Sequence, residues 1–150
     1  MSGSVRAWLL EWPSQPLALA PAEVIEVVYE PEVHRVPVGP DWCRWLVYWR
    51  DRLLPLALPS RGALDSLSVV VIAYQQAPRA PLEHAAIAVR GTPRQIEVPR
   101  DADCDPPNEG VLAEPQVRAC FLHENRPIVV PELRALFASA ISGTSQGGSP

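Results

Sequence analysis

Short runs of apolar residues alternate with polar turns along most of the chain, and prolines recur between and within the runs. The chain contains 18 prolines, and each removes a backbone donor and disfavours helix at the residue before it. The runs are rich in β-branched and aromatic residues, which is typical of strands. The pattern predicts strands at Val5–Trp12, Leu17–Ala20, Val27–Val36, Trp45–Trp49, Arg52–Leu58, Ser68–Tyr74, Ala85–Val89, Gln95–Val98, Val117–Leu122 and Pro127–Val130. Many short strands at close spacing predict a β-sandwich or β-barrel.

The tryptophans near position 45 allow two interpretations. Trp42, Trp45 and Trp49 have the i, i+3, i+7 spacing of a helical stripe, whereas Trp45, Val47 and Trp49 alternate along one face of a strand. We favour the strand, because Arg50-Asp51-Arg52 supplies a polar turn before the next apolar run. The indoles then either pack in a core or form an exposed aromatic patch for a partner.

A weak internal similarity predicts two related subdomains. Residues 46–55 resemble residues 119–128, since each segment has a hydrophobic strand, a charged turn containing Arg and a Pro-bearing apolar strand. We expect the first subdomain near residues 15–65 and the second in the later strands. Helix is expected only in short turns and at Pro131–Ala140. Residues 139–150, which include Ser-Gln-Gly-Gly-Ser-Pro, are expected to form a flexible tail.

Composition and charge narrow the class of protein. The chain is 47% hydrophobic and 20% charged, as expected for a globular domain. A net charge of −4 with scattered arginines gives no basic patch for nucleic acid. No apolar run approaches the roughly 20 residues of a membrane-spanning helix, so direct membrane insertion is not expected. Polar residues and prolines interrupt residues 1–20, so we expect no secretory leader and a cytoplasmic location.

Residues that could carry chemistry are scattered. The sequence lacks the glycine-rich phosphate loop, the Gly-x-Ser-x-Gly elbow and the His-Glu-x-x-His pair. Cys120 and His123 could supply two metal ligands, but no second pair at comparable spacing completes a site. Asp101, Asp103 and Asp105 lack the glycine and the distal glutamate of a calcium loop. We therefore expect no catalytic residues, no metal and no cofactor.

The cysteines do not indicate a disulfide framework. Cys43, Cys104 and Cys120 are odd in number and widely spaced. Reduced thiols in a cytosol fit this pattern better than stable disulfides.

A longer stretch of the sequence resembles the CheW family. The segment Pro21-Ala22-Glu23-Val24-Ile25-Glu26-Val27-Val28, then Val36-Pro37, Pro40 and residues 45–55 (Trp-Leu-Val-Tyr-Trp-Arg-Asp-Arg-Leu-Leu-Pro), is similar to the first half of a CheW domain. That family has a Val-x-Glu-[Val/Ile] element, a Pro-rich turn and a Gly-Val-x-Asn-Leu-Arg-Gly-x-x-x-Pro strand pair. Trp45 replaces the first glycine of that strand pair, and Asp51 replaces the glycine after the arginine. The likeness covers most of residues 5–137.

The resemblance implies an all-β fold of two packed five-stranded barrel-like subdomains over residues 5–137, with a short C-terminal helix. It implies a non-catalytic adaptor that couples a CheA-like histidine kinase to the cytoplasmic tip of a methyl-accepting chemoreceptor, in the cytoplasm and recruited to receptor arrays. Positions that the family uses for these contacts correspond to Val24, Glu26, Arg44, Trp45 and Arg50. The alternatives are a diverged CheW-like scaffold of another chemosensory assembly, such as one for type IV pilus motility, and a small-molecule-binding β-barrel.

Overall fold

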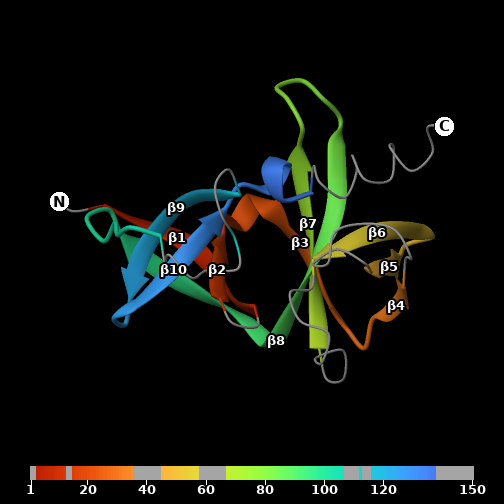
Figure 1. The fold of residues 1–150 in the computed structure, drawn as a ribbon, viewed down its shortest axis with the longest axis horizontal. Coiled ribbons are helices and arrows are strands. Elements are labelled where there is room, and N and C mark those ends of the chain that lie inside the picture. The colour runs from red at the N-terminus through yellow and green to blue at the C-terminus, as the bar shows by residue number, and fades with distance from the viewer. Residues whose placement is uncertain are drawn as a thin grey trace.

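Ten strands and very little helix make up the computed structural model, which describes residues 3–12, 15–35, 45–57, 67–106, 112 and 116–137. The strands are β1 (Ser4–Trp12), β2 (Gln15–Leu19), β3 (Val24–Tyr29), β4 (Glu32–Arg35), β5 (Trp45–Trp49), β6 (Arg52–Ala57), β7 (Leu67–Gln75), β8 (Leu82–Pro99), β9 (Val117–His123) and β10 (Arg126–Pro131). A 3-10 turn, η1, covers Pro21–Glu23, and residues 133–137 are helical. The predicted all-β class is confirmed (Figure 1).

Two predicted strand boundaries are wrong. Val27–Val36 is two strands rather than one, because Glu30 adopts a positive φ of 53° and Pro31 follows it, which ends β3 before β4 begins. The strands predicted at Ala85–Val89 and Gln95–Val98 are in fact parts of the single 18-residue strand β8.

Strand β8 is shared by the two halves of the molecule (Figure 1). Its first part pairs antiparallel with β7 and parallel with β6, and its second part pairs antiparallel with β1. Along β8, the antiparallel partner changes from β7 to β1 at the point where the register between β1 and β8 shifts. Gly91 lies in this stretch and has a φ of +68°. Glycine adopts this left-handed conformation without steric cost, so the strand bends while its pairing continues.

The first half contains β3, β7, the first part of β8, β6, β5 and β4, in that spatial order, and the second contains the rest of β8 with β1, β2, β10 and β9. The halves are therefore not successive in sequence, and the assignment of the first subdomain to residues 15–65 is wrong. Strand β2 pairs instead with β1 and, in parallel, with β10.

The internal similarity corresponds to two hairpins, β5–β6 and β9–β10. Each has a two-residue turn with positive φ at both positions, at Arg50-Asp51 (47° and 62°) and at Glu124-Asn125 (52° and 62°). This is the turn geometry that matches the twist of hairpin strands. The sequence alignment of residues 46–55 with residues 119–128 matches Arg50 to His123. In the structure, the first turn residue is Arg50 in one hairpin and Glu124 in the other, so the structural equivalence is shifted by one residue.

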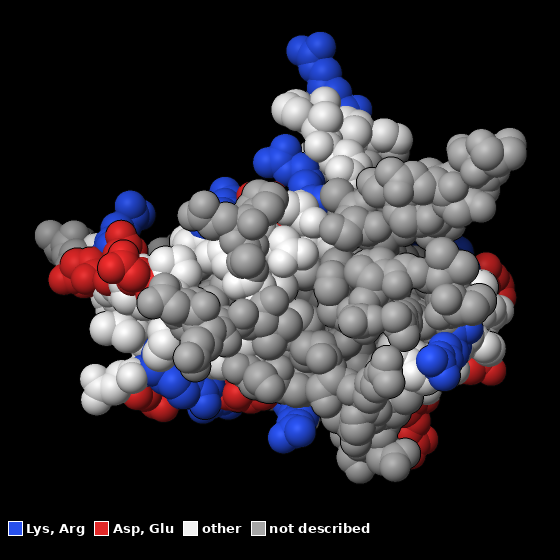
Figure 2. Space-filling model, in the orientation of Figure 1, with Lys and Arg blue, Asp and Glu red and all other residues white. Residues whose placement is uncertain are grey.

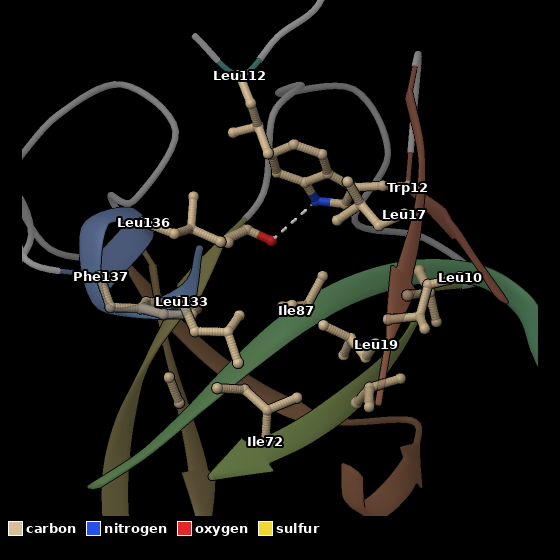
Figure 3. Packing of buried hydrophobic residues seen from close by; sticks show 14 of the residues in the cluster. Leu10, Trp12, Leu17, Leu19, Ile72, Ile87, Leu112, Leu133, Leu136 and Phe137 are labelled. Atoms are coloured by element: carbon tan, nitrogen blue, oxygen red, sulfur yellow. Dashed lines mark hydrogen bonds between the residues drawn. The ribbon is translucent and has the colours of Figure 1, made fainter. Parts of the chain in front are cut away.

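A central hydrophobic cluster joins the halves. Leu10, Leu17, Ile72 and Ile87 meet there, together with side chains from the helix at residues 133–137 (Figure 3). Trp12 is buried in the same cluster, and its Nε1 donates to the carbonyl oxygen of Ala57 at 3.3 Å. Two smaller clusters fill the individual halves, one of them around Val47 and Trp49.

The helix at residues 133–137 falls inside the predicted stretch Pro131–Ala140, whose last residues lie outside the described part. Leu133, Leu136 and Phe137 are buried in the central cluster, and Phe137 stacks on Tyr74 with ring centroids 5.8 Å apart. This short helix therefore covers the junction of the two halves (Figure 3).

The paired strands form an open sheet that is not closed into a barrel. In the second half, the segment after β8 approaches β9 through an isolated bridge between Asp103 and Phe121. The proposed domain limits, 5–137, remain a prediction, and the predicted tail at residues 139–150 lies outside the described residues.

Candidate functional site

The turn of the β5–β6 hairpin places one arginine beside a carboxylate from a distant strand. Nη2 of Arg50 donates to Oε1 of Glu26 at 2.8 Å, and Nε1 of Trp49 donates to the same oxygen at 3.4 Å. Glu26 lies on β3, which is separated from β5 in the sheet by β7, β8 and β6. The curl of the first half thus brings the β5–β6 turn, which lies one strand in from the β4 margin, against the β3 margin through side chains.

The Arg50 guanidinium also lies over an aromatic ring. Its central carbon is 4.6 Å from the centroid of the Trp49 ring, within the range of a cation–π contact. The Arg50 side chain is 67% exposed and that of Glu26 is 39% exposed. The pair therefore has solvent-facing hydrogen-bonding capacity that a partner could use.

His84 also lies beside Trp49. The two ring centroids are 5.4 Å apart, and Nδ1 of His84 is 3.4 Å from Nη1 of Arg52. Partial burial, followed by the nearby Arg52 and Arg50 charges, lowers the pKa of His84. The imidazole therefore favours its neutral form, and Arg50 and Arg52 carry the positive charge of this cluster.

The outer face of the same hairpin carries exposed apolar side chains. Tyr48 and Leu53 are directly opposite each other across β5 and β6, and both are exposed. The hydroxyl of Tyr48 donates to Oδ1 of Asp51 at 2.6 Å. This hydrogen bond is the main cause of the raised pKa of Tyr48, with smaller contributions from desolvation and from Glu32.

The predicted contact residues that the structure describes pack in different places. Glu26 and Arg50 are in direct contact, whereas Val24 is half-buried and packs against the central cluster. Trp45 is half-buried and packs against the cluster that contains Val47 and Trp49. Its placement on a strand, as predicted, is confirmed. Arg44 lies outside the described residues.

Sequence reasoning singled out Arg50 and Glu26 but missed their neighbours His84, Arg52, Tyr48 and Leu53. We call these six side chains, together with the largely buried Trp49, the Arg50 surface. Tyr48 and Leu53 could have been found, because they lie on the face opposite to Trp45, Val47 and Trp49 in the alternating pattern. His84 carries no local signal, since its neighbours come from other strands.

The remaining surface gives little indication of a chemical site. Figure 2 shows acidic and basic side chains interspersed along the outline of one face. Within the described ranges, no group of three or more His, Cys, Asp or Glu side chains could hold a metal. An open hollow of about 430 Å³ is lined partly by Glu23, Tyr74, Arg118 and Arg134. Among the helical residues described, none belongs to a helix long and apolar enough to cross a membrane.

The shared strand β8, the paired hairpins and the helix over their junction define an all-β protein with a CheW-like fold. The structure is similar to that of the scaffolding protein TtCheW from Thermoanaerobacter tengcongensis, with a TM-score of 0.69 and 15% sequence identity. The match covers 91% of this chain and 93% of that one. No family model matches the sequence, and a search of curated proteins finds no relative. The predicted CheW-like fold is confirmed at the level of structure.

Proposed function

We propose that this protein is a non-catalytic chemosensory adaptor that couples a CheA-type histidine kinase to the cytoplasmic tip of a chemoreceptor. The observation that carries the proposal is the CheW-like fold over nearly the whole chain, with a TM-score of 0.69 to a protein named as a scaffold. A cytoplasmic location at receptor arrays is part of the same proposal.

The Arg50 surface supplies the chemistry that a protein partner would need. Arginine and tyrosine are enriched among residues that dominate binding energy at interfaces. Arg50 is held by Glu26 and Trp49 in a defined orientation, and its remaining donors can form a bidentate contact with a partner carboxylate. Tyr48 and Leu53 provide exposed apolar area on the other face of the same hairpin.

Packing gives less support to a small-molecule-binding barrel. Among the described residues, buried side chains pack together inside both halves, around Val47 and Leu54 in the first and around Leu9 and Ile128 in the second. An apolar hollow of about 200 Å³ beside Ala18 and Phe121 is open to solvent and not enclosed. Ligand-binding barrels instead keep an interior cavity.

The test is direct binding of the purified protein to two partners, the regulatory domain of a CheA-type kinase and a receptor cytoplasmic fragment, by isothermal titration calorimetry. We expect saturable binding to both, and receptor-dependent stimulation of kinase autophosphorylation when all three are combined. The titrations are carried out separately with the kinase and receptor of a flagellar system and with those of a type IV pilus system. Absence of binding to the partners of every chemosensory system encoded alongside the protein would contradict the proposal.

A further inference from the structure

Two cysteines that are 16 positions apart in sequence lie side by side in the second half. Sγ of Cys104 is 2.8 Å from Sγ of Cys120, about 0.8 Å beyond the ~2.05 Å length of a disulfide bond. Both residues are free thiols in this structure. Cys120 is buried in β9, whereas Cys104 is partly exposed in the segment that follows β8.

The backbone holds this pair in register. Asp103 is opposite Phe121 in an antiparallel bridge, so Cys104 is opposite Cys120. The amide of Cys104 donates to the carbonyl of Cys120 at 3.1 Å, and the amide of Leu122 donates to the carbonyl of Ala102 at 2.9 Å. Opposed residues in antiparallel pairs have Cα atoms roughly 4.5–5.5 Å apart, within the ~4.4–6.8 Å that disulfides span. Little backbone movement would be needed to join the sulfurs.

We propose that Cys104 and Cys120 form a reversible intramolecular disulfide that covalently ties the end of the β8 segment to β9. The oxidant is a low-molecular-weight disulfide such as oxidised glutathione. The Cys104 thiolate attacks one sulfur of that disulfide, forms a mixed disulfide and releases one glutathione thiolate. Cys120 then loses its proton and attacks the Cys104 sulfur, which releases the second glutathione. Overall, two protein thiols are oxidised and one glutathione disulfide is reduced to two thiols.

The different surroundings of the two cysteines determine which thiol reacts first. Burial, together with the hydrogen bond to Cys104, raises the pKa of Cys120 to about 12, and thiolates rather than thiols are the attacking species. Cys104 is the more accessible sulfur and meets the oxidant first. Cys120 acts second, once the mixed disulfide has placed an electrophilic sulfur beside it.

The consequence for the fold is closure of the second half. Strands β8 and β9 lie at opposite ends of the path β8-β1-β2-β10-β9, and an isolated bridge connects their margins in the reduced protein. The disulfide would make that connection covalent. Oxidation should therefore raise the urea midpoint and slow amide exchange at Cys104 and Leu122.

Peptide mapping tests the inference directly. Trypsin should place Cys43, Cys104 and Cys120 in separate peptides, residues 36–44, 101–118 and 119–134, because Pro127 protects the bond after Arg126. Native protein is incubated with oxidised glutathione, alkylated without reduction, digested and analysed by mass spectrometry. We expect peptide 101–118 linked to 119–134, with loss of the link after treatment with dithiothreitol.

Three variants separate this pairing from other oxidation. Cys43→Ser should retain the link in full. Cys120→Ser should accumulate glutathione on peptide 101–118, whereas Cys104→Ser should leave peptide 119–134 largely unmodified over the same time. Absence of the linked peptide in native wild-type protein, or its appearance only in urea, would overturn the proposal. Equal glutathione labelling of Cys120 in Cys104→Ser would overturn the assigned order.

Discussion

Arg50 and Glu26 form an ion pair with an Nη2–Oε1 distance of 2.8 Å, although 24 positions separate them in the chain. The pair connects a hairpin turn to strand β3, which is not a neighbour of either strand of that hairpin. Because both side chains are more than a third exposed, the pair contributes little to stability, and its defined geometry is available for contact with a partner.

Replacing Arg50 with alanine should weaken partner binding more than it weakens the fold. An exposed ion pair is worth about 0–1 kcal/mol and an exposed cation–π contact about 0.5–1 kcal/mol. We expect a loss of no more than about 2 kcal/mol in the free energy of unfolding, measured in urea. Binding of the kinase or the receptor fragment should fall at least about tenfold, as for a residue whose truncation costs 1.4 kcal/mol or more.

A second arginine gives a matched control for this experiment. Nη2 of Arg126 contacts Oε1 of Glu11 at 2.6 Å, with similar side-chain exposure of 49% and 42%. This pair lies at the other hairpin, so Arg126→Ala should cause a comparable stability loss and leave partner affinity unchanged. If wild type and Arg50→Ala bind the kinase and the receptor fragment with equal affinity, Arg50 is not part of the interface, whatever the change in stability.

The two hairpin turns should respond differently to glycine. Asp51 and Asn125 both have a φ of 62°, a conformation that costs most L-residues roughly 1–2 kcal/mol and that glycine adopts freely because it has no Cβ. Asparagine tolerates this conformation better than most residues, so Asn125→Gly should stabilise the protein by less than about 1 kcal/mol. Asp51→Gly should gain less, because it also removes the hydrogen bond from Tyr48. Urea denaturation of both variants measures the difference, and a larger gain for Asp51→Gly would contradict the role of that hydrogen bond.

Protonation of His84 should destabilise the folded state. Its pKa is lowered by burial, Arg52 and Arg50, so below the ordinary value of about 6.5 the unfolded chain binds a proton more readily than the folded one. Stability attributable to this residue is therefore present above pH 6.5 and is lost as the pH falls toward the folded-state pKa.

NMR titration of the His84 ring should give a midpoint below 6.5, and Arg52→Ala should move it upward. His84→Gln should reduce the slope of unfolding free energy against pH just below 6.5. A midpoint at or above 6.5 in the wild-type protein would show that the two arginines do not act on this ring as the structure indicates.

Trp12 should be sensitive to loss of its indole nitrogen. It is buried in the central cluster at the end of β1 and donates to the carbonyl of Ala57 at the end of β6. Trp12→Phe retains an aromatic ring but leaves that carbonyl without this donor, which should cost about 1–3 kcal/mol. Trp12→Ala should cost about 3–5 kcal/mol because it also opens a cavity. If Trp12→Phe and Trp12→Ala lower the free energy of unfolding by the same amount, the loss in Trp12→Phe comes from packing and not from the hydrogen bond.

The local pattern of apolar and polar residues was sufficient to predict most of the strands. Alternation of Trp45, Val47 and Trp49 identified β5 with its observed bounds, because the face of a strand repeats every second residue. It failed at Gly91, where Gly-Thr-Pro has the composition of a turn. There the left-handed glycine bends β8 without ending it.

The local sequence pattern could not predict contacts between distant strands. Glu26 was singled out by resemblance, but its meeting with Arg50 and Trp49 depends on how the whole first half curls. Likewise, the separation of 16 residues between Cys104 and Cys120 gave no sign that the sulfurs lie 2.8 Å apart. Both relationships follow from strand order, which the hydrophobic pattern does not encode.

The strand order also has a consequence for biosynthesis. Strands β1 and β2 precede the other described strands on the ribosome, but they pair with β8 and with β10, which ends at Pro131. At ~5–20 residues per second, roughly 6–24 s separate translation of Trp12 from translation of Pro131. During that time Leu9, Leu10 and Leu17, all buried in the finished molecule, can pair only within the β1–β2 hairpin until β8 and then β10 follow. The nascent N-terminal hairpin is therefore the segment on which a ribosome-associated chaperone would act.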